Sequence, residues 1–305
     1  MSRIAFIFPG QGAQYKGMGR EVYEGTQTGR KVFEEASRLL GFSMQELCFT
    51  QEEKLNRTEY TQAAMVTVSI ALLRVLEERG LEPCAAAGLS LGEYAALAAV
   101  GVMSDADAIA TVRQRGILME QAVPAGVGSM AAVLGLEAGK TEAVTEKIPD
   151  VWIANYNCPG QIVISGKREA VEEACGKLKE AGARRCVGLN VSGPFHSGLL
   201  EDAGKKLGKV LEEVPIHAPR IPYVANVTAE PVREAALVKP LLIRQVSAPV
   251  RWQQGVERLI EEGIDTFIEI GPGKTLTGFV KKINRQARAF SMENLDDMER
   301  ILKEI

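Results

Sequence analysis

Short apolar runs alternate with longer helical patterns in the first part of the chain. Arg3 to Phe8 reads as a buried strand that ends at Pro9-Gly10-Gln11-Gly12, because proline and glycine interrupt regular structure. Helical patterns follow around Gly29 to Leu40 and Thr61 to Arg79, and Cys84 to Ala87 is a further short apolar run. This alternation predicts a parallel α/β sheet with functional loops at the carboxyl ends of its strands.

A different pattern occupies the middle of the chain. It predicts a strand, a helix, two strands, a helix and a strand, which is the β-α-β-β-α-β order of a ferredoxin-like unit. We therefore expect an α/β-hydrolase-like core made of residues 1–127 and 193–305, into which a ferredoxin-like small domain, residues 128–192, is inserted. The six predicted elements are Met130 to Leu134, Glu137 to Lys147, Val151 to Asn155, Gln161 to Ser165, Glu169 to Glu180 and Arg185 to Val191.

Two later segments, Tyr223 to Asn226 and Thr266 to Ile270, are further predicted strands. The second segment ends at Gly271-Pro272-Gly273, and Gly273-Lys274-Thr275 resembles the end of a phosphate-binding loop. That motif needs a glycine five positions before Gly273, where this chain has Ile268. We therefore do not expect a nucleotide site here.

Composition narrows the class of protein. The chain has 305 residues, 46% of them hydrophobic, and a net charge of −3, which provides no basic surface for nucleic acid. No apolar run reaches the ~18 residues of a membrane helix, and the N-terminal apolar run is too short for a signal peptide. The five cysteines are scattered without a C-x-x-C pair, as expected for reduced thiols. We expect a cytoplasmic protein without nucleic-acid or membrane partners.

The segment Gly88-Leu89-Ser90-Leu91-Gly92-Glu93-Tyr94 contains the Gly-x-Ser-x-Gly pattern of a nucleophile elbow. A short apolar run precedes it, and the helix-forming run Leu91 to Val100 follows. Such a strand-turn-helix context projects a serine hydroxyl out of the fold. The alternative is a plain Gly-Ser-Gly turn between a strand and a helix.

A serine hydroxyl becomes a good nucleophile when a base takes its proton, and the chain has two histidines. His196 lies in the turn-rich segment Ser192 to Ser197, where the chain returns to the main sheet. Its alternative role is to cap a helix beginning near Gly198. His217 lies between prolines and is predicted to be an exposed connector.

Taken together, the motifs resemble those of the malonyl-CoA:acyl carrier protein transacylase family. The resemblance spans almost the whole chain, and the inserted ferredoxin-like unit is the family's architecture too. The motifs that carry it follow in the family's order: Phe8 to Gln14, Gly88 to Tyr94, Gln114-Arg115-Gly116 with Met119, Asn155 to Gln161, Gly193 to Ser197, and Glu269 to Gly273.

The resemblance implies an acyl transfer in two steps. Ser90 attacks the malonyl thioester, His196 acts as its base, and the backbone N–H groups of Gln11 and Leu91 form the oxyanion hole. Coenzyme A leaves, and the phosphopantetheine thiol of holo acyl carrier protein then takes the malonyl group, for fatty acid biosynthesis. The resemblance implies no bound cofactor and no metal.

The implied substrate-binding residues are Arg115, Met119, Asn157, Phe195 and Gln245. Arg115 is the specificity residue, since a guanidinium can hold the free carboxylate of a malonyl group through two hydrogen bonds. Gln245 lies near the histidine, which a backbone carbonyl orients, and its alternative is an ordinary polar surface residue. The ring of Phe195 favours malonyl over methylmalonyl, unless it serves core packing alone.

Three further positions bear on specificity and docking. Arg113 lies two residues before Arg115 on a helix capped by Ser104, so one arginine can be buried while the other is solvated. Leu89 stands where the family usually has histidine, which leaves more of the carboxylate recognition to Arg115. The carrier protein is acidic in this family, and Arg184 and Arg185 are candidates for docking it.

Three alternative functions remain at this point. One is a stand-alone acyltransferase or acyl hydrolase that serves a polyketide synthase. Another is an esterase of the α/β-hydrolase type, although such enzymes place an acid and then a late histidine after the serine. The last is a non-catalytic module that binds the carrier protein.

Overall fold

The larger domain is built on a six-stranded sheet with the order β10-β9-β1-β2-β7-β8. The computed structural model describes residues 2–124 and 126–305. All neighbouring strands pair in parallel except β7 and β8, which are antiparallel. The predicted α/β class is therefore confirmed. The strands are β1 (Ile4–Phe8), β2 (Ala85–Gly88), β7 (Tyr223–Val224), β8 (Pro231–Val232), β9 (Thr266–Ile270) and β10 (Arg288–Met292).

Both faces of this sheet are covered by helices, which explains why β1 and β9 are buried at every position. Phe6 and Phe8 of β1 belong to a core cluster with α5 (Thr58–Glu78), α6 (Gly92–Ala99) and α7 (Asp105–Gln121). Ala5 and Ile7 point to the other face and pack with α12 (Trp252–Glu261) and α13 (Thr275–Ile283). The period of two along β1 thus divides the core into two layers.

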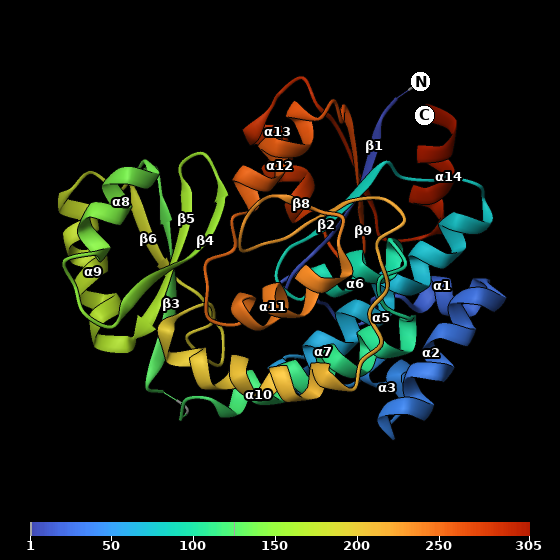
Figure 1. Ribbon diagram of the computed structural model, residues 1–305, viewed down its shortest axis with the longest axis horizontal. Coiled ribbons are helices and arrows are strands. Elements are labelled where there is room, and N and C mark those ends of the chain that lie inside the picture. Colours follow the sequence, from blue (N-terminus) through green and yellow to red (C-terminus); the bar gives the residue numbers. More distant parts are fainter. Residues whose placement is uncertain (1, 125) are drawn as a thin grey trace.

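The remaining helices enclose this core (Figure 1). Ser104 caps α7 as predicted, because its side chain accepts a hydrogen bond from the N–H of Asp107. The 3₁₀ turn Gly198–Leu200 leads into α10. The other helices are α1 (Arg20–Gly25), α2 (Gln27–Leu40), α3 (Met44–Phe49), α4 (Glu52–Leu55), α10 (Glu201–Glu212), α11 (Ala235–Gln245) and α14 (Leu295–Glu304).

A second, antiparallel sheet forms the smaller lobe at the left of Figure 1, with the order β4-β5-β3-β6. Its chain order is β-α-β-β-α-β, so the predicted ferredoxin-like unit is confirmed. The domain limits at residues 128 and 192 stay a prediction. The elements are β3 (Gly128–Leu134), α8 (Ala138–Thr145), β4 (Val151–Cys158), β5 (Gln161–Lys167), α9 (Arg168–Glu180) and β6 (Arg185–Gly188).

Strand β4 is longer than predicted, and it is hydrogen-bonded to the larger domain. It continues through Asn157 and Cys158, which the sequence had placed in the turn to β5, because two register shifts keep it paired with β5. The N–H of Tyr156 donates to the carbonyl of Val250 at 2.9 Å, and the N–H of Val250 donates to Ala154 at 2.8 Å. These bonds fix β4 beside the larger domain.

Two other predicted strands are shorter than expected. The strand predicted to end at Val191 ends at Gly188, and the strand predicted to reach Asn226 ends at Val224. In both cases the chain leaves its partner strand, β3 or β2, before that strand ends, and the following residues form loops. None of the helices in the described residues is long and apolar enough to cross a membrane.

Candidate active site

Ser90 lies on the sharp turn between β2 and α6, with a φ of 55° in the left-handed region. The flanking glycines permit this turn. A Cβ atom on Gly88 would lie 2.0 Å from the backbone of Gly92, and one on Gly92 would lie 2.3 Å from the carbonyl oxygen of Phe8. The N–H of Ser90 donates to Asn226 Oδ1 at 2.7 Å. The geometry is that of a nucleophile elbow rather than of an ordinary turn.

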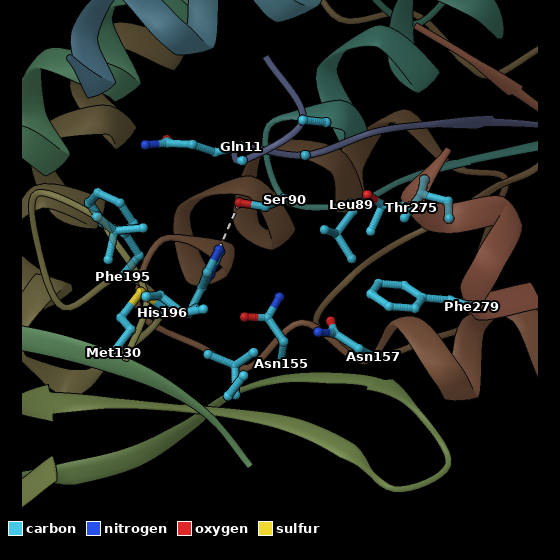
Figure 2. Close-up of a pocket in the computed structure, with 18 of the residues that line it drawn as sticks. Gln11, Leu89, Ser90, Met130, Asn155, Asn157, Phe195, His196, Thr275 and Phe279 are labelled. Atoms are coloured by element: carbon cyan, nitrogen blue, oxygen red, sulfur yellow. Dashed lines mark hydrogen bonds between the residues drawn. The ribbon is translucent and has the colours of Figure 1, made fainter. Parts of the chain in front are cut away.

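His196 is buried and lies within hydrogen-bond distance of the serine. Its Nε2 is 2.7 Å from Ser90 Oγ (Figure 2). Its Nδ1 is 2.8 Å from the carbonyl oxygen of Gln245. Because a carbonyl only accepts, Nδ1 carries the proton and Nε2 is free to accept the proton of Ser90. Burial, together with the charge of Arg115, lowers the pKa of His196 to about 3. The ring is therefore a neutral base.

Arg115 reaches Ser90 from α7 and is 1% exposed. Its Nη1 donates to Gln62 Oε1 at 2.7 Å. Its Nη2 donates to Ser90 Oγ at 3.1 Å and to Gln245 Oε1 at 3.0 Å. No carboxylate of the described residues forms a salt bridge with it. A buried guanidinium without a paired anion beside a nucleophile suits a substrate that carries a carboxylate.

The sequence allows one arginine of the pair to be solvated, but Arg113 is largely buried as well. Its side chain is 13% exposed and pairs with Glu59 at 2.9 Å. Its guanidinium also lies 4.2 Å from the ring centroid of Tyr60. The two arginines do face different ways, but the second one is held in an ion pair and a cation–π contact instead of facing water.

Gln245, at the end of α11, is 1% exposed, so its alternative as a surface residue is wrong. Its backbone carbonyl orients His196, and its side-chain oxygen accepts from Arg115. Its Nε2 donates to the carbonyl oxygen of Ser90 at 3.0 Å and to Glu93 Oε2 at 2.6 Å. This one residue thus contacts the serine, the histidine and the arginine.

Sequence reasoning missed Gln62, Glu93 and Asn226 as parts of this network. Each carried a signal: Gln62 is a polar residue on the almost wholly buried helix α5, and Glu93 lies within the elbow motif. Asn226 follows a strand of the parallel sheet at its carboxyl end, where functional side chains gather.

The backbone N–H groups of Gln11 and Leu91 are the predicted donors of an oxyanion hole. Neither donates to a protein acceptor within the part of the chain that the structure describes. Leu91 directly precedes α6, whose N-terminus adds positive potential. The side chain of Gln11 turns away to donate to Thr58 Oγ1 at 3.0 Å, so its loop is fixed beside Ser90 (Figure 2).

A cavity of about 250 Å³ opens in front of Ser90, between the two domains. Of the predicted substrate-binding residues, Met119, Asn157 and Phe195 line the cavity, whereas Arg115 and Gln245 do not. Other lining residues come from the Gln11 loop, β3 to β5, the segment after β6, and α13. They include Gln62, Leu89, Met130, Ala132, Asn155, Gln161, Val163, Leu189, Val191, Thr275, Leu276 and Phe279.

Both polar and apolar side chains line the cavity (Figure 2). Asn155 and Asn157 project into it from β4, and Asn157 Oδ1 has no protein partner among the described residues. Leu89 and Phe279 line it from the larger domain. Arg184 and Arg185 lie outside it, exposed at the start of β6. His217 is an exposed connector, as predicted.

Comparison with known proteins places the chain in a family. A model described as "acyl transferase domain" matches residues 5–300. The malonyl CoA-acyl carrier protein transacylase of Bacillus subtilis is 46% identical over 98% of this chain and 96% of its own, and that of Staphylococcus aureus (strain MRSA252) is 42% identical over 98% of each.

Solved structures agree with this. An acyl carrier protein S-malonyltransferase from Vibrio cholerae superposes with a TM-score of 0.96 at 40% identity, covering 98% of this chain and 100% of its own. A malonyl-transacylase solved in complex with a type II PKS acyl carrier protein gives a TM-score of 0.97 at 38% identity, covering 100% of both. Sequence and structure together show that this chain belongs to the acyl transferase domain family.

Proposed function

We propose that this chain transfers a malonyl group from malonyl-CoA to the phosphopantetheine thiol of holo acyl carrier protein, in fatty acid biosynthesis. One observation carries the choice of acyl group. Arg115 Nη2 lies 3.1 Å from Ser90 Oγ, and its buried guanidinium has no ion-pair partner among the described residues. A malonyl ester on Ser90 supplies the missing anion, whereas an acetyl ester does not. The names of the relatives support the same activity.

The first half-reaction follows from the positions of Ser90 and His196. As Ser90 Oγ attacks the thioester carbonyl, its proton moves to His196 Nε2, which lies 2.7 Å away. The N–H groups of Gln11 and Leu91 stabilise the tetrahedral oxyanion. The carbon–sulfur bond then breaks, the coenzyme A sulfur takes the proton from His196, and malonyl-Ser90 remains.

The second half-reaction reverses these roles. The phosphopantetheine thiol gives its proton to His196, and its sulfur attacks the malonyl ester. The ester bond breaks and Ser90 Oγ recovers its proton from His196, which leaves malonyl on the carrier protein. Every proton and acyl group comes from the substrates and these two side chains, so the proposal needs no bound cofactor or metal.

The cavity supplies contacts for the rest of the substrate. Asn157 Oδ1 is buried and has no protein partner in the described residues, so it can accept a hydrogen bond from an amide of the pantetheine arm. Phe195 and Met119 line the wall near the acyl group, and Phe195 leaves little room for an α-methyl substituent. A cytoplasmic location accompanies this proposal, since the five cysteines are free thiols.

Incubation with radiolabelled malonyl-CoA tests the proposal. We expect one stable label per chain, no label on Ser90→Ala, and movement of the label to carrier protein when its holo form is added. The apo carrier protein, which lacks the thiol, is the matched control. Rapid release of malonate to water would instead show a hydrolase, and an unlabelled wild-type protein would show a non-catalytic module.

A further inference from the structure

Glu93 is a buried carboxylate within the elbow motif that carries Ser90. It lies in the first turn of α6, three positions after Ser90, and is 1% exposed. It does not line the cavity, and it forms no salt bridge with a described residue. A buried carboxylate without a direct cation is costly, so its presence within the elbow motif calls for an explanation.

Both hydrogen bonds of Glu93 converge on one oxygen. Oε2 accepts from Gln245 Nε2 at 2.6 Å and from the N–H of Asn226 at 3.1 Å. Oε1 has no partner among the described residues. A proton on Oε1, or an amide nitrogen in its place, would therefore leave both hydrogen bonds intact. The network thus depends on the acceptor oxygen Oε2 and not on the negative charge of Glu93.

The bond from Gln245 determines which way its amide points. With Nε2 directed at Glu93 and at the Ser90 carbonyl, Oε1 faces Arg115 Nη2 at 3.0 Å. The opposite orientation would set an NH₂ group against the guanidinium and an oxygen against the carboxylate, so donor would meet donor and acceptor would meet acceptor. Glu93 thus holds the amide that holds Arg115.

Glu93 also supports the turn that carries the nucleophile. Its second donor, the N–H of Asn226, belongs to a residue whose side chain bridges the elbow. Asn226 Oδ1 accepts from the N–H of Ser90 at 2.7 Å, and its Nδ2 donates to the carbonyl of Gly88 at 2.7 Å. Glu93 Oε2 therefore links the elbow to Arg115, through Asn226 on one side and the side-chain amide of Gln245 on the other.

We infer that Glu93 is a positioning residue that sets the preference for a carboxylated acyl group by fixing Gln245 and, through it, Arg115. This inference rests on the proposed malonyl transfer. Glu93 touches neither substrate nor the reacting atoms, so its effect is on where the guanidinium points. The preference for malonyl over acetyl is the quantity that depends on that direction.

Two conservative variants separate the acceptor from the charge. Glu93→Gln removes the charge and keeps an oxygen at the Oε2 position. Glu93→Asp keeps the charge and withdraws the acceptor by about 1.5 Å, the length of one carbon–carbon bond. Both are small changes, and titration of active sites by the burst of acyl-enzyme normalises each rate to the folded fraction.

The measurement is kcat/KM for malonyl-CoA and for acetyl-CoA with each variant. We expect Glu93→Gln to keep the malonyl-to-acetyl ratio within about threefold of the wild type, and Glu93→Asp to lower it about tenfold, mainly through a higher KM for malonyl-CoA. The reverse order, or an equal loss on both thioesters in Glu93→Asp, overturns the inference. Failure of the wild type itself to accept malonyl would instead overturn the proposed function.

Discussion

The hydroxyl of Ser90 is held between a base and a cation. His196 Nε2 accepts from it and Arg115 Nη2 donates to it, at 2.7 and 3.1 Å. The cation favours negative charge on the oxygen, and it also opposes a second positive charge on the imidazole. Burial and, after it, this cation keep the histidine neutral. One arginine would therefore serve both the proposed nucleophile and the proposed base.

This arrangement predicts an unusual pH dependence of acylation. For a histidine with an ordinary pKa near 6.5, the neutral fraction would fall ~25-fold between pH 7 and pH 5. Because the pKa of His196 is lowered to about 3, it stays neutral over this range. We expect the single-turnover rate of acylation by malonyl-CoA to change little from pH 7 to pH 5.

A fall in that rate with a midpoint near pH 6.5 would contradict the prediction. Protein stability must be measured alongside the rate, because the lowered pKa of His196 also makes the stability depend on pH. Below pH 6.5 the unfolded chain takes up a proton at His196 that the folded chain refuses until about pH 3, so this residue lowers stability as the pH falls. A far-UV spectrum at each pH confirms that the fold persists.

Replacement of Arg115 by alanine is expected to impair malonyl transfer selectively. Without Arg115 the carboxylate of the malonyl group has no buried partner, which costs about 2–5 kcal/mol of transition-state binding. Acetyl transfer loses only the contact between Arg115 and Ser90 Oγ. The measurement is kcat/KM for the two thioesters. Arg113→Ala is the matched control on the same helix, because Arg113 pairs with Glu59. The preference of this variant for malonyl over acetyl should equal that of the wild type. Equal losses on both thioesters in Arg115→Ala would refute this role.

At the scale of elements, the close approach of β2 to α6 makes the elbow. The Cβ atom introduced by Gly88→Ala would lie 2.0 Å from the backbone of Gly92, and no flexible side chain can absorb that overlap. We expect the free energy of unfolding to fall by about 1–3 kcal/mol, as in overpacked cores, and acylation of Ser90 to fall with it. Urea unfolding measures the first effect and the malonyl burst the second.

Gly176→Ala in the middle of α9 is the control for that substitution. Nothing lies within 4 Å of a Cβ atom built there, so alanine should raise stability by about 0.5–1 kcal/mol through its better helix propensity. A Gly88→Ala variant as stable as the wild type would show that β2 and α6 separate easily, and that the elbow does not depend on this contact.

Elements with a strong local pattern were predictable, and those that depend on a partner were not. Strand β9 is predicted at its observed bounds because Phe267, Ile268 and Ile270 form a short, mainly apolar segment that ends at Gly271-Pro272-Gly273. Strand β4 was cut short at Asn155, since its polar end is kept in the sheet by pairing with β5 across register shifts. Strands β8 and β10 have no comparable apolar run, and their pairing with β7 and β9 creates them.

The same distinction holds for the site. Ser90 and His196 followed from the residues around them, because a glycine-flanked turn and a scarce histidine are local signals. Arg115, by contrast, was indicated by a family resemblance. Its burial and its bonds to Gln62 and Gln245 join residues 53 and 130 positions away in sequence. Only the packing of α5, α7 and α11 brings these side chains together, and no local pattern encodes it.

At the scale of the whole molecule, the small domain forms one wall of the cavity and carries the two arginines predicted to dock the carrier protein. Leu189, just after β6, lines the cavity, and Arg184 and Arg185 are exposed at the other end of that strand. Extended chain from Arg185 to Leu189 spans roughly 13 Å. A carrier protein bound at these arginines is therefore close enough for its phosphopantetheine arm to enter the cavity.

Charge reversal tests this surface. Arg184 and Arg185 form no salt bridge with a described residue, so Arg184→Glu with Arg185→Glu should leave the fold intact. Repulsion of an acidic carrier protein is expected to raise KM for that substrate, most strongly at low ionic strength, and to leave KM for malonyl-CoA unchanged. The matched control is Arg30→Glu with Lys31→Glu on α2, at the opposite end of the molecule (Figure 1). If both pairs raise KM for the carrier protein equally, the effect is one of net charge and the docking surface lies elsewhere.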